Sequence, residues 1–139
     1  MKYRIPLLLA TAAGLILFLS LRPSPVLAEI AWLPDWLASW ADRHGELRTA
    51  VPFFGFSCYI GLEACLAFPK SRDLPALVWL FGAHALGALL LIVELLQIPL
   101  PQRNFTWGDL GFGTLGILAG GLTILGHRIL LSLLSKNDT

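Results

Sequence analysis

Apolar residues occur in four long runs, and the segments between them collect most of the charged residues and prolines. The runs cover residues 5–21, 49–68, 74–97 and 108–134. A helix needs about 20 mostly apolar residues to span a bilayer. Pro99 and Pro101 mark a break between the last two runs. The pattern predicts an all-α membrane protein, with four transmembrane helices in a single domain of residues 1–139.

The segment between the first two runs has an amphipathic pattern. Its tryptophans recur every four residues, at Trp32, Trp36 and Trp40, while Asp35 and Asp42 fall on the other face of a helix. Such a helix lies along the membrane interface with its tryptophan rings at headgroup depth. We predict a short interfacial helix over residues 33–44. A lid over a lipid-facing site is the alternative interpretation.

The basic residues suggest an orientation. Four spans place six of them on one side, Lys2, Arg4, Lys70, Arg72, Arg128 and Lys136, and four on the other, Arg22, Arg43, Arg48 and Arg103. Short loops rich in lysine and arginine stay in the cytoplasm. The bias therefore predicts cytoplasmic termini, with residues 22–48 outside.

A secretory signal is the competing interpretation of the N-terminus. Residues 2–28 have a basic start and an apolar core, and Val26-Leu27-Ala28 resembles a cleavage site. The apolar core is at or above the usual upper length for a signal peptide. Cleavage would also leave three spans, with the termini on opposite sides. We therefore expect the first span to be retained.

Charge is scarce, at 14% of residues against 56% hydrophobic ones. An ionisable group at a bilayer boundary is costly, so it indicates a functional site. The formal net charge of +1 argues against a nucleic-acid partner. Cys58 and Cys65 lie in one predicted helix, roughly 10 Å apart along its axis, which is too far for a disulfide between them.

Polar residues gather where the third span ends and the fourth begins. Glu94 is expected to pair with Arg103 or Arg48, or else to hold a proton. Asp109 is expected either to cap the fourth helix, or to orient Arg103 or bind a cation. Arginine suits phosphate because its planar fork donates two hydrogen bonds. The predicted ligand-binding residues are Arg48, Glu94, Gln97, Arg103 and Asp109.

Three glycines share one face of the fourth span, at Gly113, Gly116 and Gly120. Gly116 and Gly120 form a GxxxG pair, which lets another helix approach closely. We predict a helix-packing seam there. His84 is expected to hydrogen-bond to a neighbouring helix, and Glu63 is interpreted as structural.

Motifs for metal or cofactor chemistry are missing. The sequence has no HExxH, no Cys/His cluster, no GxSxG and no phosphate-binding P-loop. We expect no metal and no cofactor. No enzyme reaction is specified.

The polar segment resembles the VanZ-like family of small bacterial membrane proteins. The family pattern is matched in order by Glu94, Gln97, Arg103, Asp109, Gly116 and Gly120, whereas Gly113 stands where the family usually has asparagine. The segment LSLRP at 19–23 also looks like the end of the family's first span. The resemblance implies a multi-pass protein of the bacterial plasma membrane. One family member is associated with resistance to teicoplanin, so an effect on glycopeptide susceptibility is implied.

The leading hypothesis is a non-enzymatic envelope protein. It would bind an anionic lipid or a lipid-linked cell-wall headgroup at its outer face. One alternative is a membrane enzyme acting on a lipid headgroup, with Glu94 as general base. The other is a structural subunit that packs through its glycines against a membrane-protein partner or a second copy of the chain.

Overall fold

The fold is described from a computed structural model. It describes residues 10, 13–14, 16–18, 20–21, 24, 26–71, 73–100 and 105–137. Within these residues the regular elements are all helical: a 3-10 turn, η1 (Leu27–Glu29), and the helices α2 (Asp35–Arg43), α3 (Gly45–Ala67), α4 (Leu74–Gln97) and α5 (Trp107–Asn137). The predicted first span lies largely outside the described residues.

The three long helices are α3, α4 and α5, with 23, 24 and 31 residues. Each is long and apolar enough to cross a membrane. This confirms the second, third and fourth apolar runs as helices. The helix α3 begins at Gly45, four residues before the predicted start, because the polar segment 45–48 continues the helix beyond its apolar part.

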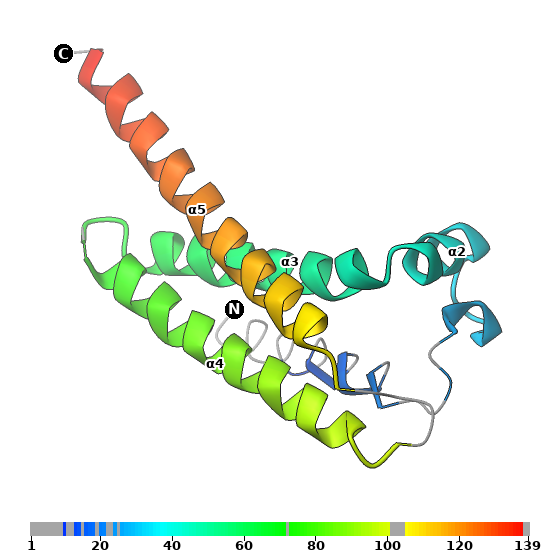
Figure 1. The fold of residues 1–139 in the computed structure, drawn as a ribbon. Coiled ribbons are helices and arrows are strands. Elements are labelled where there is room, and N and C mark those ends of the chain that lie inside the picture. The colour runs from blue at the N-terminus through cyan, green and yellow to red at the C-terminus, as the bar shows by residue number, and fades with distance from the viewer. Residues whose placement is uncertain are drawn as a thin grey trace.

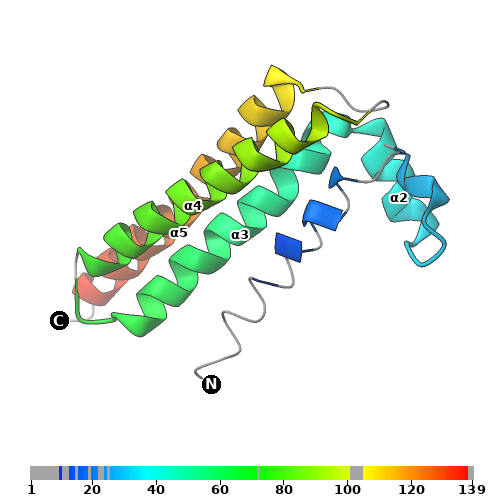
Figure 2. The same ribbon diagram turned by 90° about the horizontal axis from the view of Figure 1, so that it is seen from below.

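These helices form a bundle in which α3 packs most extensively against α5 and also contacts α4 (Figure 1). The start of α3, the end of α4 and the start of α5 lie at one end of the bundle (Figure 2). The helix α2 lies beside this end. The connection over residues 98–106 joins α4 to α5, so the two are antiparallel neighbours.

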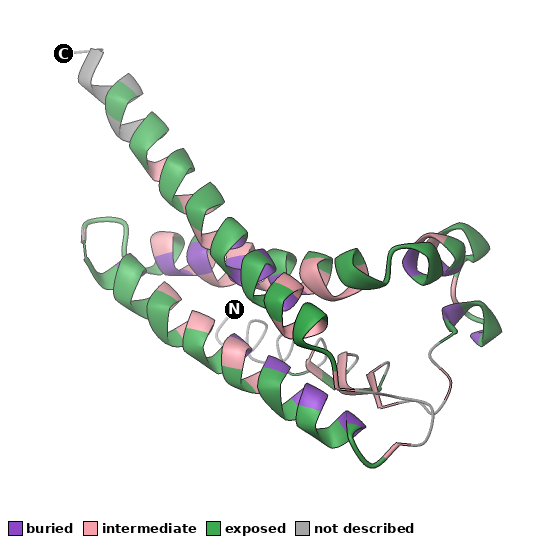
Figure 3. Cartoon of the chain, in the orientation of Figure 1, coloured by how far each residue is buried: buried purple, intermediate pink, exposed green. Residues whose placement is uncertain are grey.

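The core is small, and the outer surface is apolar. Phe53, Leu86, Leu90 and Ile117 form the buried cluster between the three helices. Large apolar side chains such as that of Phe81 remain on the outside, and exposed positions dominate the outer faces of α4 and α5 (Figure 3). Helices that are apolar on all sides suit a membrane rather than water.

The glycines of α5 lie against other helices. A side chain added at Gly116 would collide with the Ala50 carbonyl oxygen on α3. A Cβ atom at Gly120 would lie 2.6 Å from the Cβ of Ser57, and one at Gly113 would lie 2.5 Å from Cδ2 of Leu90. Gly116 and Gly120 thus face α3, whereas Gly113 faces α4.

One hydroxyl group links all three long helices. The Ser57 hydroxyl on α3 donates to the Ile117 carbonyl of α5 at 2.6 Å and accepts from the indole N–H of Trp79 on α4 at 2.9 Å. Ser57 is fully buried. Hydrogen bonds of this kind hold helices together where apolar contacts alone give little preference for one partner over lipid.

Two smaller expectations have opposite outcomes. Nδ1 of His84 lies 2.8 Å from the Leu80 carbonyl of its own helix, and the ring is exposed. The expected bond from His84 to a neighbouring helix is therefore wrong. Cys58 and Cys65 are both free, which confirms that they do not bridge to each other.

The helix α2 agrees closely in extent with the predicted 33–44 segment. Ala38 and Ala41 pack against Leu27 and Ile30. The Asp42 carboxylate accepts the backbone N–H groups of Leu27 and Ala28 and so holds the preceding turn. Of the three tryptophans of the amphipathic segment, two are exposed, Trp32 at 61% and Trp36 at 73%.

Candidate functional site

The first turn of α5 fixes the position of Asp109. Thr106 directly precedes the helix, and its hydroxyl accepts the backbone N–H of Asp109 at 3.2 Å. The same hydroxyl donates to Oδ2 of Asp109 at 2.6 Å. A threonine that caps the free N–H groups at a helix start stabilises that start. The carboxylate of Asp109 is therefore held at the end of the bundle.

The other carboxylate oxygen of Asp109 connects α5 to α3. Oδ1 accepts the hydroxyl of Thr49 at 3.1 Å. Two hydroxyl donors from different segments thus bind one half-buried carboxylate. This contact lies next to the position where Gly116 allows α5 to approach the backbone of α3.

Glu94 lies in the last turn of α4 and is only 2% exposed. Its Oε2 accepts the backbone N–H of Thr106 at 3.3 Å. This bond joins the end of α4 to the start of α5. Gln97, three residues further along α4, is on the same side of the helix and 6% exposed. Both polar side chains are therefore buried at the shared end of the helices.

Arg48 approaches from the first turn of α3. Its guanidinium group lies 4.0 Å from Oδ1 of Asp42 on α2. Four residues later Pro52 stands inside α3. Proline has no backbone N–H, so the usual helical hydrogen bond to the Arg48 carbonyl is not made. Arg48 thus lies where α3 lacks one of its regular backbone hydrogen bonds.

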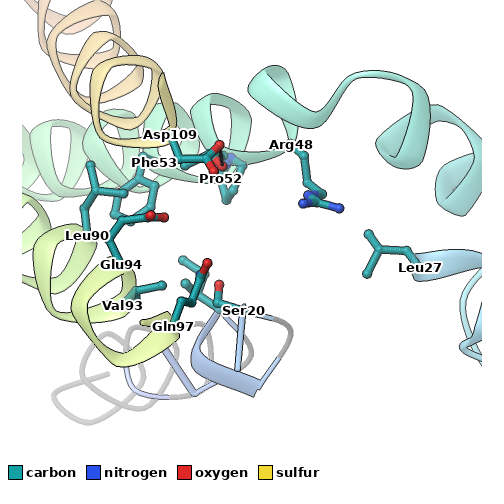
Figure 4. A pocket seen from close by; sticks show the side chains of 12 residues that line it. Ser20, Leu27, Arg48, Pro52, Phe53, Leu90, Val93, Glu94, Gln97 and Asp109 are labelled. Atoms are coloured by element: carbon teal, nitrogen blue, oxygen red, sulfur yellow. Dashed lines mark hydrogen bonds between the residues drawn. The ribbon is translucent and has the colours of Figure 1, made fainter. Parts of the chain in front are cut away.

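These side chains line one cavity of about 100 Å³. Glu94 and Gln97 point into it from α4, Asp109 from α5 and Arg48 from α3 (Figure 4). Apolar side chains form most of the remaining wall, including Phe53, Leu90 and Val93, and the N-terminal segment adds Ile16 and Ser20. Pockets for whole small molecules measure about 300–1,000 Å³. This one has room for a fragment the size of a headgroup unit.

Four of the five predicted ligand-binding residues therefore meet, although they come from three helices. They are Arg48, Glu94, Gln97 and Asp109. Arg103 lies outside the described residues. The predicted packing glycines Gly113, Gly116 and Gly120 follow Asp109 along α5, where they set the spacing between helices.

Two polar residues of this layer were not predicted, Thr49 and Thr106. The pattern of a threonine three residues before an acidic residue and an apolar run signals a helix start. Thr106 and Asp109 have this spacing, so Thr106 could have been predicted from the sequence. Thr49 carries no such signal, because its bond to Asp109 depends on the packing of α3 against α5.

Other cavities have a different character. Two of about 350 Å³ each open between the helices and are lined almost entirely by apolar side chains. Among the residues that the structure describes, no cluster of three or more His, Cys, Asp or Glu side chains could hold a metal ion. The cavity at the shared helix ends thus combines buried polar groups in a way that the other two do not.

The chain was compared with protein-family models, with curated proteins and with solved structures, and none of these matched.

Proposed function

We propose that this is a multi-pass protein of the bacterial cell envelope that binds the phosphate-containing headgroup of an anionic lipid. The observation that carries the proposal is the meeting of Arg48, Glu94, Gln97 and Asp109 in one cavity at the end of three membrane-length helices. Buried ionisable groups at a membrane boundary are costly, so their presence there favours a function. The resemblance to the VanZ-like family belongs to the same proposal, as does an effect on glycopeptide susceptibility.

In this proposal the cavity opens near the outer surface of the plasma membrane. The charge bias of the loops favours this orientation. The exposed rings of Trp32 and Trp36 suit a position of α2 at the headgroup layer. A lipid in the outer leaflet would then reach the cavity with its headgroup while its acyl chains stay in the bilayer, which fits the small volume of the site.

Arg48 is the phosphate ligand in this arrangement. Its guanidinium group lines the cavity and is 29% exposed, so it remains accessible from the rim. A guanidinium group binds phosphate through paired hydrogen bonds. Arg103 from the 98–106 connection would add a second cation.

The test is retention of lipid by the purified protein. Native mass spectrometry of the full chain in mild detergent should show a bound anionic phospholipid. We expect Arg48→Ala to reduce this retention at least ten-fold and Arg43→Ala to leave it unchanged, because the Arg43 side chain bonds to Ser39 of its own helix and lies outside the cavity. Equal retention by both variants would overturn the proposal.

A second candidate is an enzyme that acts on a lipid headgroup. The burial of Glu94 in a cavity favours it, because a shielded carboxylate can act as a general base. Turnover of a labelled lipid that is lost in Glu94→Gln and kept in Glu63→Gln would establish this candidate. Glu63 is the matched control because it lies elsewhere in a membrane-length helix, on α3.

The structural-subunit alternative has less support. It relies on Gly116 and Gly120 as a surface for a partner. Both glycines already lie against α3 of the same chain, with the Ala50 carbonyl and the Ser57 side chain at the two positions. A partner would have to bind elsewhere on the bundle.

A further inference from the structure

Gln97 has no assigned purpose in phosphate binding, yet it is buried at the site. Its side chain lines the cavity and is 6% exposed. Among the described residues, no hydrogen-bond partner accompanies its side-chain amide. Buried polar groups without a partner are rare and unfavourable. Figure 4 shows the amide directed into the cavity, so a bound molecule is the natural partner for it.

The amide and the carboxylates impose complementary demands on that molecule. An amide donates through nitrogen and accepts through oxygen, whereas an ionised carboxylate only accepts. Glu94 accepts the backbone N–H of Thr106, and Asp109 accepts the hydroxyls of Thr49 and Thr106. Since each carboxylate oxygen can accept two hydrogen bonds, Asp109 can take a further donor. A hydroxyl group meets both demands, since it can donate to a carboxylate and accept from the amide.

The charge distribution separates two parts of the ligand. Among the described side chains of the cavity, two carboxylates face one guanidinium group. A phosphate in the deep part would meet the negative carboxylates. It is better placed near Arg48, which leaves Glu94, Gln97 and Asp109 to surround a neutral, hydrogen-bonding group.

We propose that the cavity selects a headgroup with several hydroxyls, a glycerol or sugar unit joined to the lipid through phosphate. Gln97 and Glu94 bind the hydroxyls, and Arg48 binds the phosphate. This inference rests on the proposed function and adds the chemical class of the headgroup. No covalent step is involved.

The test compares lipids of equal charge, one with hydroxyl groups in its headgroup and one without. Phosphatidylglycerol and phosphatidylethanol with identical acyl chains carry the same phosphodiester charge, but only the first has a diol. Full-length protein in mild detergent is mixed with equal amounts of both and measured by native mass spectrometry. A second pair, a polyisoprenyl phosphoryl sugar and the ethyl ester of the same polyisoprenyl phosphate, also carries equal phosphodiester charge and covers the carbohydrate source.

We expect at least a ten-fold preference for the hydroxyl-bearing member of one pair, and the pair that shows it identifies glycerol or sugar as the source. Gln97→Leu should bring that ratio close to one. Thr123→Val, which removes an exposed hydroxyl from α5 outside the cavity, should keep it. The lipid ratio measured for the parent protein tests the proposal even if a variant fails to fold.

The outcomes separate the two proposals. Equal retention of both members in both pairs overturns the hydroxyl selection and leaves phosphate binding in place. A preference that persists in folded Gln97→Leu also overturns it. Failure of the parent to retain any of these lipids overturns the proposed function itself.

Discussion

At the scale of single residues, the site depends on hydroxyl groups that bind the half-buried carboxylate of Asp109. Asp109 is bound by Thr106 on one oxygen and by Thr49 on the other. Without these donors the carboxylate would lose hydrogen bonds in a partly shielded position, which is unfavourable. The two threonines thus belong to this polar layer together with the charged residues that the sequence predicts.

Thr106→Val should destabilise the protein by removing the cap of α5. The loss of an N-terminal cap costs about 0.5–2 kcal/mol, and here the bond to the Asp109 carboxylate is lost as well. Thermal unfolding in detergent is the measurement. Thr114→Val is the matched control, because the Thr114 hydroxyl bonds only to the Leu110 carbonyl within α5. Identical melting of the two variants would contradict this role of Thr106.

Ser57→Ala should also destabilise the bundle, by a separate mechanism. The variant leaves the Trp79 indole N–H and the Ile117 carbonyl without their shared partner. Hydrogen bonds between membrane helices average about 0.6 kcal/mol and reach about 1.7. Denaturant titration should show a loss in this range. Thr123→Ala, whose hydroxyl bonds within its own helix, should change the free energy of unfolding less.

At the scale of elements, the apolar runs alone predict α3, α4 and α5 well. Each run is long, and length with continuous apolarity is a strong signal for a membrane helix. The start of α3 is harder, since the polar residues 45–48 belong to the helix but not to its apolar part. The buried face of α4 is also harder. It follows Leu86, Leu90 and Gln97 rather than His84, because the contacts of α3 and α5 decide which face is covered.

The glycines of α5 should tolerate leucine only where no other helix is close. Gly116→Leu places a side chain against the backbone of α3. The expected cost is about 1–3 kcal/mol, the usual range for overpacking. Gly126→Leu is the control, because nothing lies within 4 Å of a Cβ atom at Gly126. The measurement is the free energy of unfolding in detergent. Equal values for both variants and the parent would contradict the packing seam.

At the scale of the whole molecule, the sequence predicts part of the site's assembly. The short 98–106 connection requires α4 and α5 to be neighbours, so the meeting of Glu94 and Asp109 is foreseeable. The presence of Thr49 and Arg48 in the same layer is less foreseeable. They come from α3, more than forty residues earlier, and are placed by its close packing against Gly116 and Gly120. No local pattern encodes this tertiary contact.

The orientation of the molecule in the membrane is the last prediction, and impermeant thiol labelling of intact cells tests it. In a background with Cys58 and Cys65 replaced by alanine, Ser39→Cys on α2 should react, because the charge bias places this side outside. Ser71→Cys, in the loop between α3 and α4, should react only after the cells are opened. The two positions are matched controls for each other, since they lie beside opposite ends of α3. The reverse pattern would place the cavity on the cytoplasmic side. A mature chain beginning at Glu29 would contradict the retained first span, and with it the wall that Ile16 and Ser20 give to the cavity.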